Sequence, residues 1–211
     1  MSTGGTRKGA SRRRKELALA LCVSLWIAGG SVAGAADPAD LYLDADDNIT
    51  PASGYPAQAT VEKPAGTTKT LSVTGGFWNG WNIYGGYDNS GWMDLKGYTL
   101  TLKGANIIGN VYGAKTGEWV KGNSVTLNNS ATVNGSVYGG YSNANDASDN
   151  SVTLNGASVT DNVYGGYSGG SGKVSGNSVT LNGGNVTGNV YGGYSVSGDG
   201  LGQYPEPFRR E

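Results

Sequence analysis

A segment that repeats about every 26 to 28 residues constrains this chain more than any other feature of its sequence, because this period is typical of solenoid proteins. Copies begin at Ile83, Val111, Val137, Val163 and Val190, so the spacing is nearly constant. A unit of this length is one supersecondary element that cannot bury its own apolar face, so a core forms only when units stack on one another. The sequence therefore predicts a solenoid, and its function has to be sought on the surface of the array.

The clearest strand signal in each copy is NSVTLN, at residues 123–128, 150–155 and 177–182. Valine and leucine alternate with threonine there, which is the period-two pattern of a strand with one buried face. We expect the apolar side chains of this segment to point inwards: Val125, Val152, Val179, Leu127, Leu154 and Leu181.

A second strand signal is VYGGY, and a weaker one is a short segment centred on a valine between the other two. Glycine and asparagine fill the corners because they accept positive φ angles. Three short strands per copy, tight corners and no helix-length apolar pattern predict an all-β fold. The specific prediction is a right-handed parallel β-helix of about four to five coils with 26–28 residue repeats.

Other repeat folds fit less well. Propeller blades need about 40 or more residues, leucine-rich repeats need a leucine scaffold, and calcium β-rolls repeat about every nine residues. The nearest rival is a left-handed solenoid with half the period, but VYGGY recurs only once in each full repeat, which counts against it.

Stacked coils would place identical residues on top of one another. The expected ladders are asparagines 123, 150 and 177, valines 137, 163 and 190, tyrosines 84, 112, 138, 164 and 191, and a second tyrosine line at 87, 141, 167 and 194. Lys115 interrupts that second line. The segments between VYGGY and NSVTLN vary most, and variable loops on one edge of a solenoid usually carry its binding surface.

The first 36 residues have the pattern of a secretory signal peptide. A basic region from Arg7 to Lys15 leads into the apolar segment Leu17 to Ala28, and small residues follow. This apolar run is shorter than the about 20 residues that span a membrane. We expect cleavage after Ala35 or Ala36 and export through the inner membrane.

The rest of the chain divides into three expected parts: residues 37–74 as a polar lead-in and N-terminal cap, residues 75–195 as the repeats, and residues 196–211 as an irregular tail. The bulky side chains of Phe77, Trp78 and Trp81 are suited to cover the open end of the first coil.

The composition excludes several kinds of catalytic and metal-binding site. The 211 residues include no histidine and a single cysteine, Cys22, in the expected signal peptide. Ser-His and Cys-His pairs are therefore absent, as is any imidazole ligand for a metal. Residues 166–170 match the GxSxG pattern of a nucleophile elbow, but Ser168 would lack a base. We expect no catalytic residues and no cofactor.

Acidic residues raise the question of a metal site. Residues 44–48 alternate oxygen ligands as a calcium loop does, but Ile49 stands where that loop needs glycine and Tyr55 where it needs a bidentate glutamate. The segment is therefore expected to be an acidic turn, and no metal site is predicted.

Carboxylates also raise the question of an enzyme, because parallel β-helices host polysaccharide lyases and hydrolases that work with clustered acids. Asp146, Asp149 and Asp161 share one repeat. The first two lie in a variable loop and the third replaces a corner residue, so no catalytic pair follows. A carbohydrate-active β-helix enzyme or a carbohydrate-binding module is the alternative class, and a buried carboxylate pair across adjacent coils would favour the enzyme.

Charge argues against a nucleic-acid partner. The totals are 15 basic and 16 acidic residues, and removing the six basic and one acidic residues of positions 1–35 leaves nine and fifteen, a net charge of −6. No basic run that could hold phosphates survives.

Aromatic side chains are the remaining candidates for ligand binding, since tyrosine rings can stack on sugar rings. The candidate binding residues are Tyr138, Tyr141, Tyr164, Tyr167, Tyr191 and Tyr194. The competing interpretation is that these rings pack on one another along the ladders.

The segment GNSVTLNGGNVTGNVYGGYS, together with the long basic signal peptide, resembles the passenger repeats of bacterial autotransporters, the type V secretion proteins of Gram-negative bacteria. The resemblance covers residues 75–195. It implies a β-helical passenger, displayed at the cell surface or secreted and acting in adhesion, with surface molecules or glycans of host or neighbouring cells as partners. A non-functional truncated autotransporter is a further alternative.

The chain departs from that family after Tyr194, where only the short segment from Ser195 to Glu211 follows. A membrane barrel needs at least eight strands of about ten residues, so we expect a passenger without its own anchor, extracellular or at the cell surface, or in the periplasm if export stalls. The last coil would expose a strand edge, and open edges recruit other strands. Self-association through this C-terminal edge is therefore expected.

Overall fold

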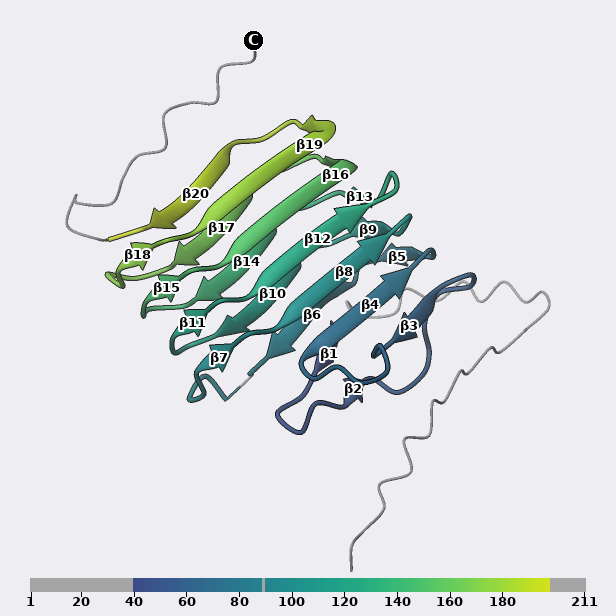
Figure 1. Ribbon diagram of the computed structural model, residues 1–211, viewed down its shortest axis with the longest axis horizontal. Coiled ribbons are helices and arrows are strands. Elements are labelled where there is room, and N and C mark those ends of the chain that lie inside the picture. Colours follow the sequence, from purple (N-terminus) through teal and green to yellow (C-terminus); the bar gives the residue numbers. More distant parts are fainter. Residues whose placement is uncertain (1–39, 89, 198–211) are drawn as a thin grey trace, which may run out of the picture.

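The computed structural model describes residues 40–88 and 90–197. These residues form twenty strands and no helix, so no helix in this part is long and apolar enough to cross a membrane. The strands stack as a parallel β-solenoid of about five turns (Figure 1), which confirms the predicted fold class. The expected signal peptide, and the expected tail from residue 198 onward, lie outside the described residues.

One face of the solenoid is a seven-stranded sheet, here called the tyrosine sheet, in the order β2-β1-β6-β10-β14-β17-β20. Its strands are β1 (Asp40–Leu43), β2 (Ile49–Thr50), β6 (Asn82–Tyr87), β10 (Val111–Thr116), β14 (Val137–Ser142), β17 (Val163–Ser168) and β20 (Val190–Ser195). All neighbours in this sheet are parallel except β2, which is antiparallel to β1. The VYGGY copies pair letter for letter, and Val137 lies between Val111 and Val163. The sequence period is therefore the coil period.

A second face is a four-stranded sheet of two-residue strands, here called the short sheet, in the order β18-β15-β11-β7. Its strands are β7 (Leu95–Lys96), β11 (Val120–Lys121), β15 (Ala147–Ser148) and β18 (Val174–Ser175). The sequence assigned these residues to variable loops, so this face was not predicted. Its signal is an apolar residue three positions before the asparagine ladder, as in Val120 before Asn123. That side chain is fully buried because it closes the core between the other two faces.

The third face, here called the long sheet, follows the order β3-β4-β8-β12-β16-β13-β9-β5, with β19 paired to β16. Its strands are β3 (Thr60–Glu62), β4 (Thr70–Thr74), β5 (Phe77–Asn79), β8 (Thr99–Lys103), β9 (Asn106–Ile108), β12 (Ser124–Asn128), β13 (Thr132–Val133), β16 (Ser151–Val159) and β19 (Ser178–Val186). Two strands run through the predicted corner after NSVTLN. Gly156 and Gly183 lie there at φ angles of 70° and 77° and let β16 and β19 continue.

The inward alternation of NSVTLN is confirmed. Val152 and Leu154 are fully buried, and their counterparts in the preceding coil are at most 1% exposed. Val179 and Leu181 belong to the outermost described strand of the long sheet and are half-buried against the core. Burying a valine or leucine side chain contributes about 1.5–3 kcal/mol, so each complete coil adds several such terms.

The asparagine ladder is also confirmed, and it lies inside the stack. The Asn123 Oδ1 accepts the Tyr98 backbone N–H at 2.9 Å, and the Asn123 Nδ2 donates to the Asn150 Oδ1 at 3.0 Å. The Asn150 Nδ2 donates in turn to the Asn177 Oδ1 at 3.0 Å. Each buried amide is thus satisfied by its neighbours, which fixes the register of the coils.

The N-terminal end of the stack is covered, and the first coil begins earlier than residue 75, because β1 and β4 already pair with β6 and β8. Trp78 is fully buried and lies edge-on to Trp81, with ring centroids 5.2 Å apart. Phe77 points outward instead and is 55% exposed, because it precedes the inward position of β5. Trp78 and Trp81 thus pack with Tyr55 at this end, and Phe77 does not take part.

Candidate functional site

Both tyrosines of each VYGGY lie on the outer face of the tyrosine sheet. The first glycine, such as Gly139, is skipped in the register, so the strand places its two tyrosines on one side although they are three positions apart. The second glycine faces inward, and a Cβ on Gly140 would come within 2.5 Å of the Asn150 side chain. Glycine is therefore required at this position to admit the asparagine ladder.

The structure brings all six candidate tyrosines together in two lines. In the inner line the ring centroids of Tyr138 and Tyr164 are 4.9 Å apart, and those of Tyr164 and Tyr191 are 5.2 Å apart, with nearly parallel planes. In the outer line Tyr141 and Tyr167 stack at 4.8 Å. The two lines meet edge to face, as between Tyr138 and Tyr141, whose centroids are 5.2 Å apart at 85°.

This stacking limits what the tyrosines can bind. A sugar ring packs against an aromatic face, but within the lines each face is already covered by the tyrosine of the next coil. Tyr112 and Tyr164 are only 6% and 9% exposed. Burial raises the pKa of Tyr138 to about 12 against an opposing hydrogen bond with Ser136. The geometry thus favours packing as the main role of these rings.

Lys115 continues the outer line where it lacks a tyrosine. Its Nζ lies 5.0 Å from the centroid of Tyr112 and 5.2 Å from that of Tyr141, so the ammonium replaces ring stacking with cation–π contacts. Burial lowers the pKa of Lys115, and Asp40 partly opposes that shift. The ladder is therefore continuous in packing, although it is interrupted in sequence.

Exposed large apolar side chains occur in the loops between the tyrosine sheet and the short sheet. Trp92 is 82% exposed, Met93 44% and Trp119 50%. The loops carrying Trp92 and Trp119 are neighbours, because a Cβ on Gly117 would lie 2.6 Å from the Gly91 carbonyl oxygen. The sequence pointed to these variable loops but did not single out their tryptophans.

Asp88 holds the first of these loops in place. Its carboxylate accepts the backbone N–H groups of Ser90, Trp92 and Met93 at 2.7–2.9 Å. Burial acts to raise the pKa of Asp88, but these bonds and the Ser90 hydroxyl outweigh it and lower the pKa. The backbone of the exposed Trp92 is therefore tied to Asp88.

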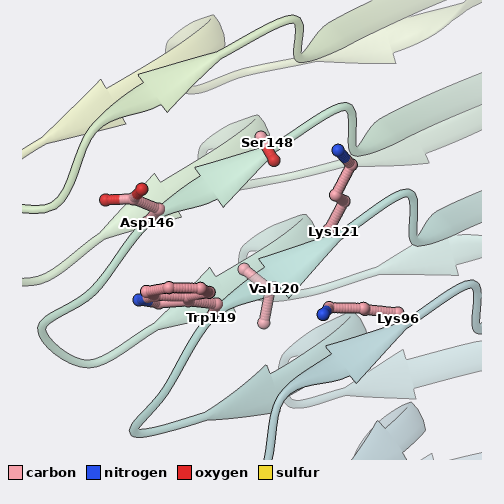
Figure 2. A pocket seen from close by; sticks show the side chains of 6 residues that line it. All are labelled: Lys96, Trp119, Val120, Lys121, Asp146 and Ser148. Carbon is pink, nitrogen blue, oxygen red and sulfur yellow. The ribbon is translucent and has the colours of Figure 1, made fainter.

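Trp119 lines an open groove of about 270 Å³ on the outer side of the short sheet. Figure 2 shows the six lining residues, which come from three successive coils: Lys96, Trp119, Val120, Lys121, Asp146 and Ser148. Apart from Val120 itself, they are outward residues that flank the buried positions of β7, β11 and β15. The groove thus follows directly from the two-residue strands.

Backbone hydrogen bonds fix this groove. The carbonyl of Trp119 accepts the Leu95 N–H at 3.0 Å, and the Val120 N–H donates to the Asp146 carbonyl at 3.0 Å. Beside them the Asn145 Nδ2 donates to the Glu118 Oε2 at 3.1 Å. The tryptophan is therefore positioned by ladder pairing on both sides.

The acidic residues do not gather into one site. Asp146 lines the groove, Asp149 pairs with Lys121 at 3.4 Å, and Asp161 accepts the Ser136 hydroxyl at the corner before β17. Ser168, the serine of the GxSxG match, is fully buried. Among the described residues no group of three or more His, Cys, Asp or Glu side chains could hold a metal ion.

Comparison with known proteins adds no relative, since no protein-family model, curated protein or solved structure matches the chain. The class defined by the structure is a parallel β-solenoid with one aromatic face and one grooved edge. The autotransporter resemblance rests on the repeat motif and the signal-peptide pattern.

Proposed function

We propose that this chain is an exported, non-enzymatic β-solenoid passenger, displayed at the cell surface or secreted, that acts in adhesion. The observation that carries the proposal is the exposure of Trp92, Met93 and Trp119 on neighbouring loops of a rigid stack. Exposed apolar groups that cluster on a soluble scaffold mark interaction surfaces. Tryptophan is also the residue type most enriched among binding hot spots.

The hydrogen bonds that hold these loops support the proposed binding role. The loops are held by the Asp88 carboxylate and by backbone pairing between coils, so little conformational entropy is lost when a partner binds. Loops fixed on a regular scaffold are the usual carriers of binding residues. The signal-peptide pattern and the autotransporter-like repeats support export and a partner outside the cell, on a host or neighbouring cell.

The proposed export of the chain is tested by expressing the full chain in a Gram-negative host and finding where the product is located. The proposal predicts a processed product that is found outside the inner membrane and, on intact cells or in the medium, is accessible to added protease. A product that keeps its first 36 residues and stays in the cytoplasm would overturn the export part of the proposal.

Adhesion is tested by coating beads with the full chain and counting their attachment to cultured epithelial cells and to bacterial lawns. The double variant W92A/W119A removes both exposed indoles, and F77A is the matched control because Phe77 is 55% exposed at another part of the stack. We expect the double variant to lose attachment and the control to retain it. Attachment equal in all three proteins, or no attachment by the unaltered chain, would contradict an adhesive role of this edge.

A further inference from the structure

We propose that the groove around Trp119 binds neutral polysaccharides, with one sugar ring lying on the indole. This inference rests on the proposed adhesive function and names its ligand class. It is carried by three properties of the groove: a half-exposed tryptophan, polar walls that both donate and accept hydrogen bonds, and two lysine charges that are each paired with a carboxylate.

Trp119 is 50% exposed, and its neighbours in the ladder are not aromatic. Val120 pairs with Leu95 and Ala147, so the positions above and below Trp119 are Asp94 and Asp146. Each is too small to cover an indole, and no described ring stacks on it, in contrast to the tyrosine lines. Figure 2 shows the ring edge-on, with Asp146 on the side of one face. That face can receive the C–H side of a sugar ring.

The walls of the groove match hydroxyl groups, which both donate and accept. The Asp146 Oδ1 accepts the Lys173 backbone N–H at 2.8 Å, and a carboxylate has further lone pairs for a sugar hydroxyl. Ser148 supplies a hydroxyl beside it. Lys96 and Lys121 supply ammonium groups whose side chains are 54% and 59% exposed, each with three N–H donors.

Charge selects a neutral ligand over an acidic one. Lys96 pairs with Asp94 at 3.2 Å, and Lys121 pairs with Asp149 at 3.4 Å, so both ammonium charges are matched. Asp146 adds a carboxylate with no cation paired to it among the ion pairs of the described residues. A uronate or sulfated sugar would bring a second negative charge towards Asp146 and would be repelled.

The volume of the groove indicates that it holds one ring of a longer sugar chain. The groove of about 270 Å³ lies just below the range of about 300–1,000 Å³ typical of pockets that enclose a small molecule, and it is open to the surface. A single bound ring gives weak affinity. Many copies on one cell surface would convert it into firm attachment, because linked sites bind with a high effective concentration.

The test uses the purified full chain and three neutral hexasaccharides, cellohexaose, chitohexaose and mannohexaose, with hexagalacturonate as the acidic comparison. Binding is measured by calorimetry and by saturation-transfer NMR at millimolar sugar. We expect at least one neutral hexasaccharide to bind more tightly than hexagalacturonate. W119A should weaken that binding about tenfold or more, W119F should retain most of it, and F77A, at an exposed aromatic residue outside the groove, should change it less than about threefold. Trp119 is half-exposed, so these variants should keep the melting temperature of the unaltered chain.

Three results would overturn the inference: no binding of any neutral hexasaccharide, tighter binding of hexagalacturonate, or equal binding by W119A. The proposed function fails differently. If W92A/W119A beads lose attachment while the unaltered chain binds none of the three neutral sugars, adhesion stands and the glycan inference falls. If neutral sugars bind through Trp119 but coated beads do not attach, the glycan site stands and adhesion falls.

Discussion

Replacing Asn150 with alanine tests whether the buried amide ladder holds the coils in register. Asn150 is fully buried. Its Oδ1 accepts the backbone N–H and the Nδ2 of Asn123, both at 3.0 Å. Its Nδ2 donates to the Val120 carbonyl at 3.2 Å and to the Asn177 Oδ1 at 3.0 Å. One side chain thus joins the short sheet to the asparagines of the coils on either side.

The expected loss of unfolding free energy in the alanine variant follows from these four hydrogen bonds. The alanine variant removes all of them and deprives the Asn123 N–H and the Val120 carbonyl of these partners in the interior. A buried group left without a partner costs about 1–3 kcal/mol, so we expect the free energy of unfolding to fall by about 3–5 kcal/mol. That is a large part of the about 5–15 kcal/mol by which domains are stable.

The assay is urea unfolding of the full chain followed by far-ultraviolet circular dichroism. Asn182→Ala is the matched control, because the Asn182 side chain is exposed and donates one bond, to the Asn155 Oδ1 at 2.9 Å. We expect the control to lose less than about 1 kcal/mol. A second variant, N150D, keeps the shape but cannot donate and buries a charge, so it should also be strongly destabilised. Equal midpoints for N150A and N182A would refute the ladder argument.

Three further expectations concern the core, the tyrosine lines and the strand edge. Val152→Asp buries an unpaired charge and should destabilise the chain by about 2–4 kcal/mol more than Thr153→Asp on the outer face; equal unfolding midpoints would mean that the strand faces the other way. Burial raises the pKa of Tyr138 to about 12 from about 10 in the unfolded chain, so the contribution of Tyr138 to stability is fully present below about pH 10 and is lost as the pH rises through about 12. Tyrosinate absorbance that titrates entirely near pH 10 in folded protein would contradict this. We also propose that half-buried Leu181 at the outermost described strand lies in a self-association surface, so that Leu181→Lys reduces the oligomer fraction in sedimentation; an unaltered chain that stays monomeric at high concentration would exclude it.

The sequence alone predicted the period, the coil register and the inward side chains because all three depend on local alternation. NSVTLN pairs with itself at the predicted spacing, and Val152 and Leu154 are buried as expected. Letter-for-letter repetition leaves one register that aligns every ladder at once, and parallel stacking is the arrangement that satisfies it.

The short sheet could not be read in the same way, because two-residue strands contain one inward position and no alternation. Leu95, Val120 and Ala147 occupy that position in successive coils, and only the structure shows that they close the core. In two coils the corner predicted after NSVTLN does not end the strand. Gly156, for example, bends β16 while the ladder between β16 and β19 continues.

The candidate site changed for a physical reason that composition does not show. In a ladder of identical tyrosines each ring covers the face of the next. Trp119, in contrast, is the one aromatic residue at its ladder position, and Asp94 and Asp146 occupy that position in the adjacent coils. An aromatic residue that breaks a ladder is therefore better placed for stacking on a ligand than one that continues it. That rule was available from the sequence only if the short strands had been recognised.

We propose that the loops carrying Trp92 and Trp119, and not the tyrosine sheet, contact the binding target. Hydroxyl-radical footprinting of the full chain, free and attached to the cells that bind it, measures this directly through the oxidation rate of each aromatic side chain. We expect protection of Trp92 and Trp119 on attachment and an unchanged rate at Tyr194, which is 38% exposed on the other face. Protection of Tyr194 with unchanged rates at both tryptophans would contradict the claim.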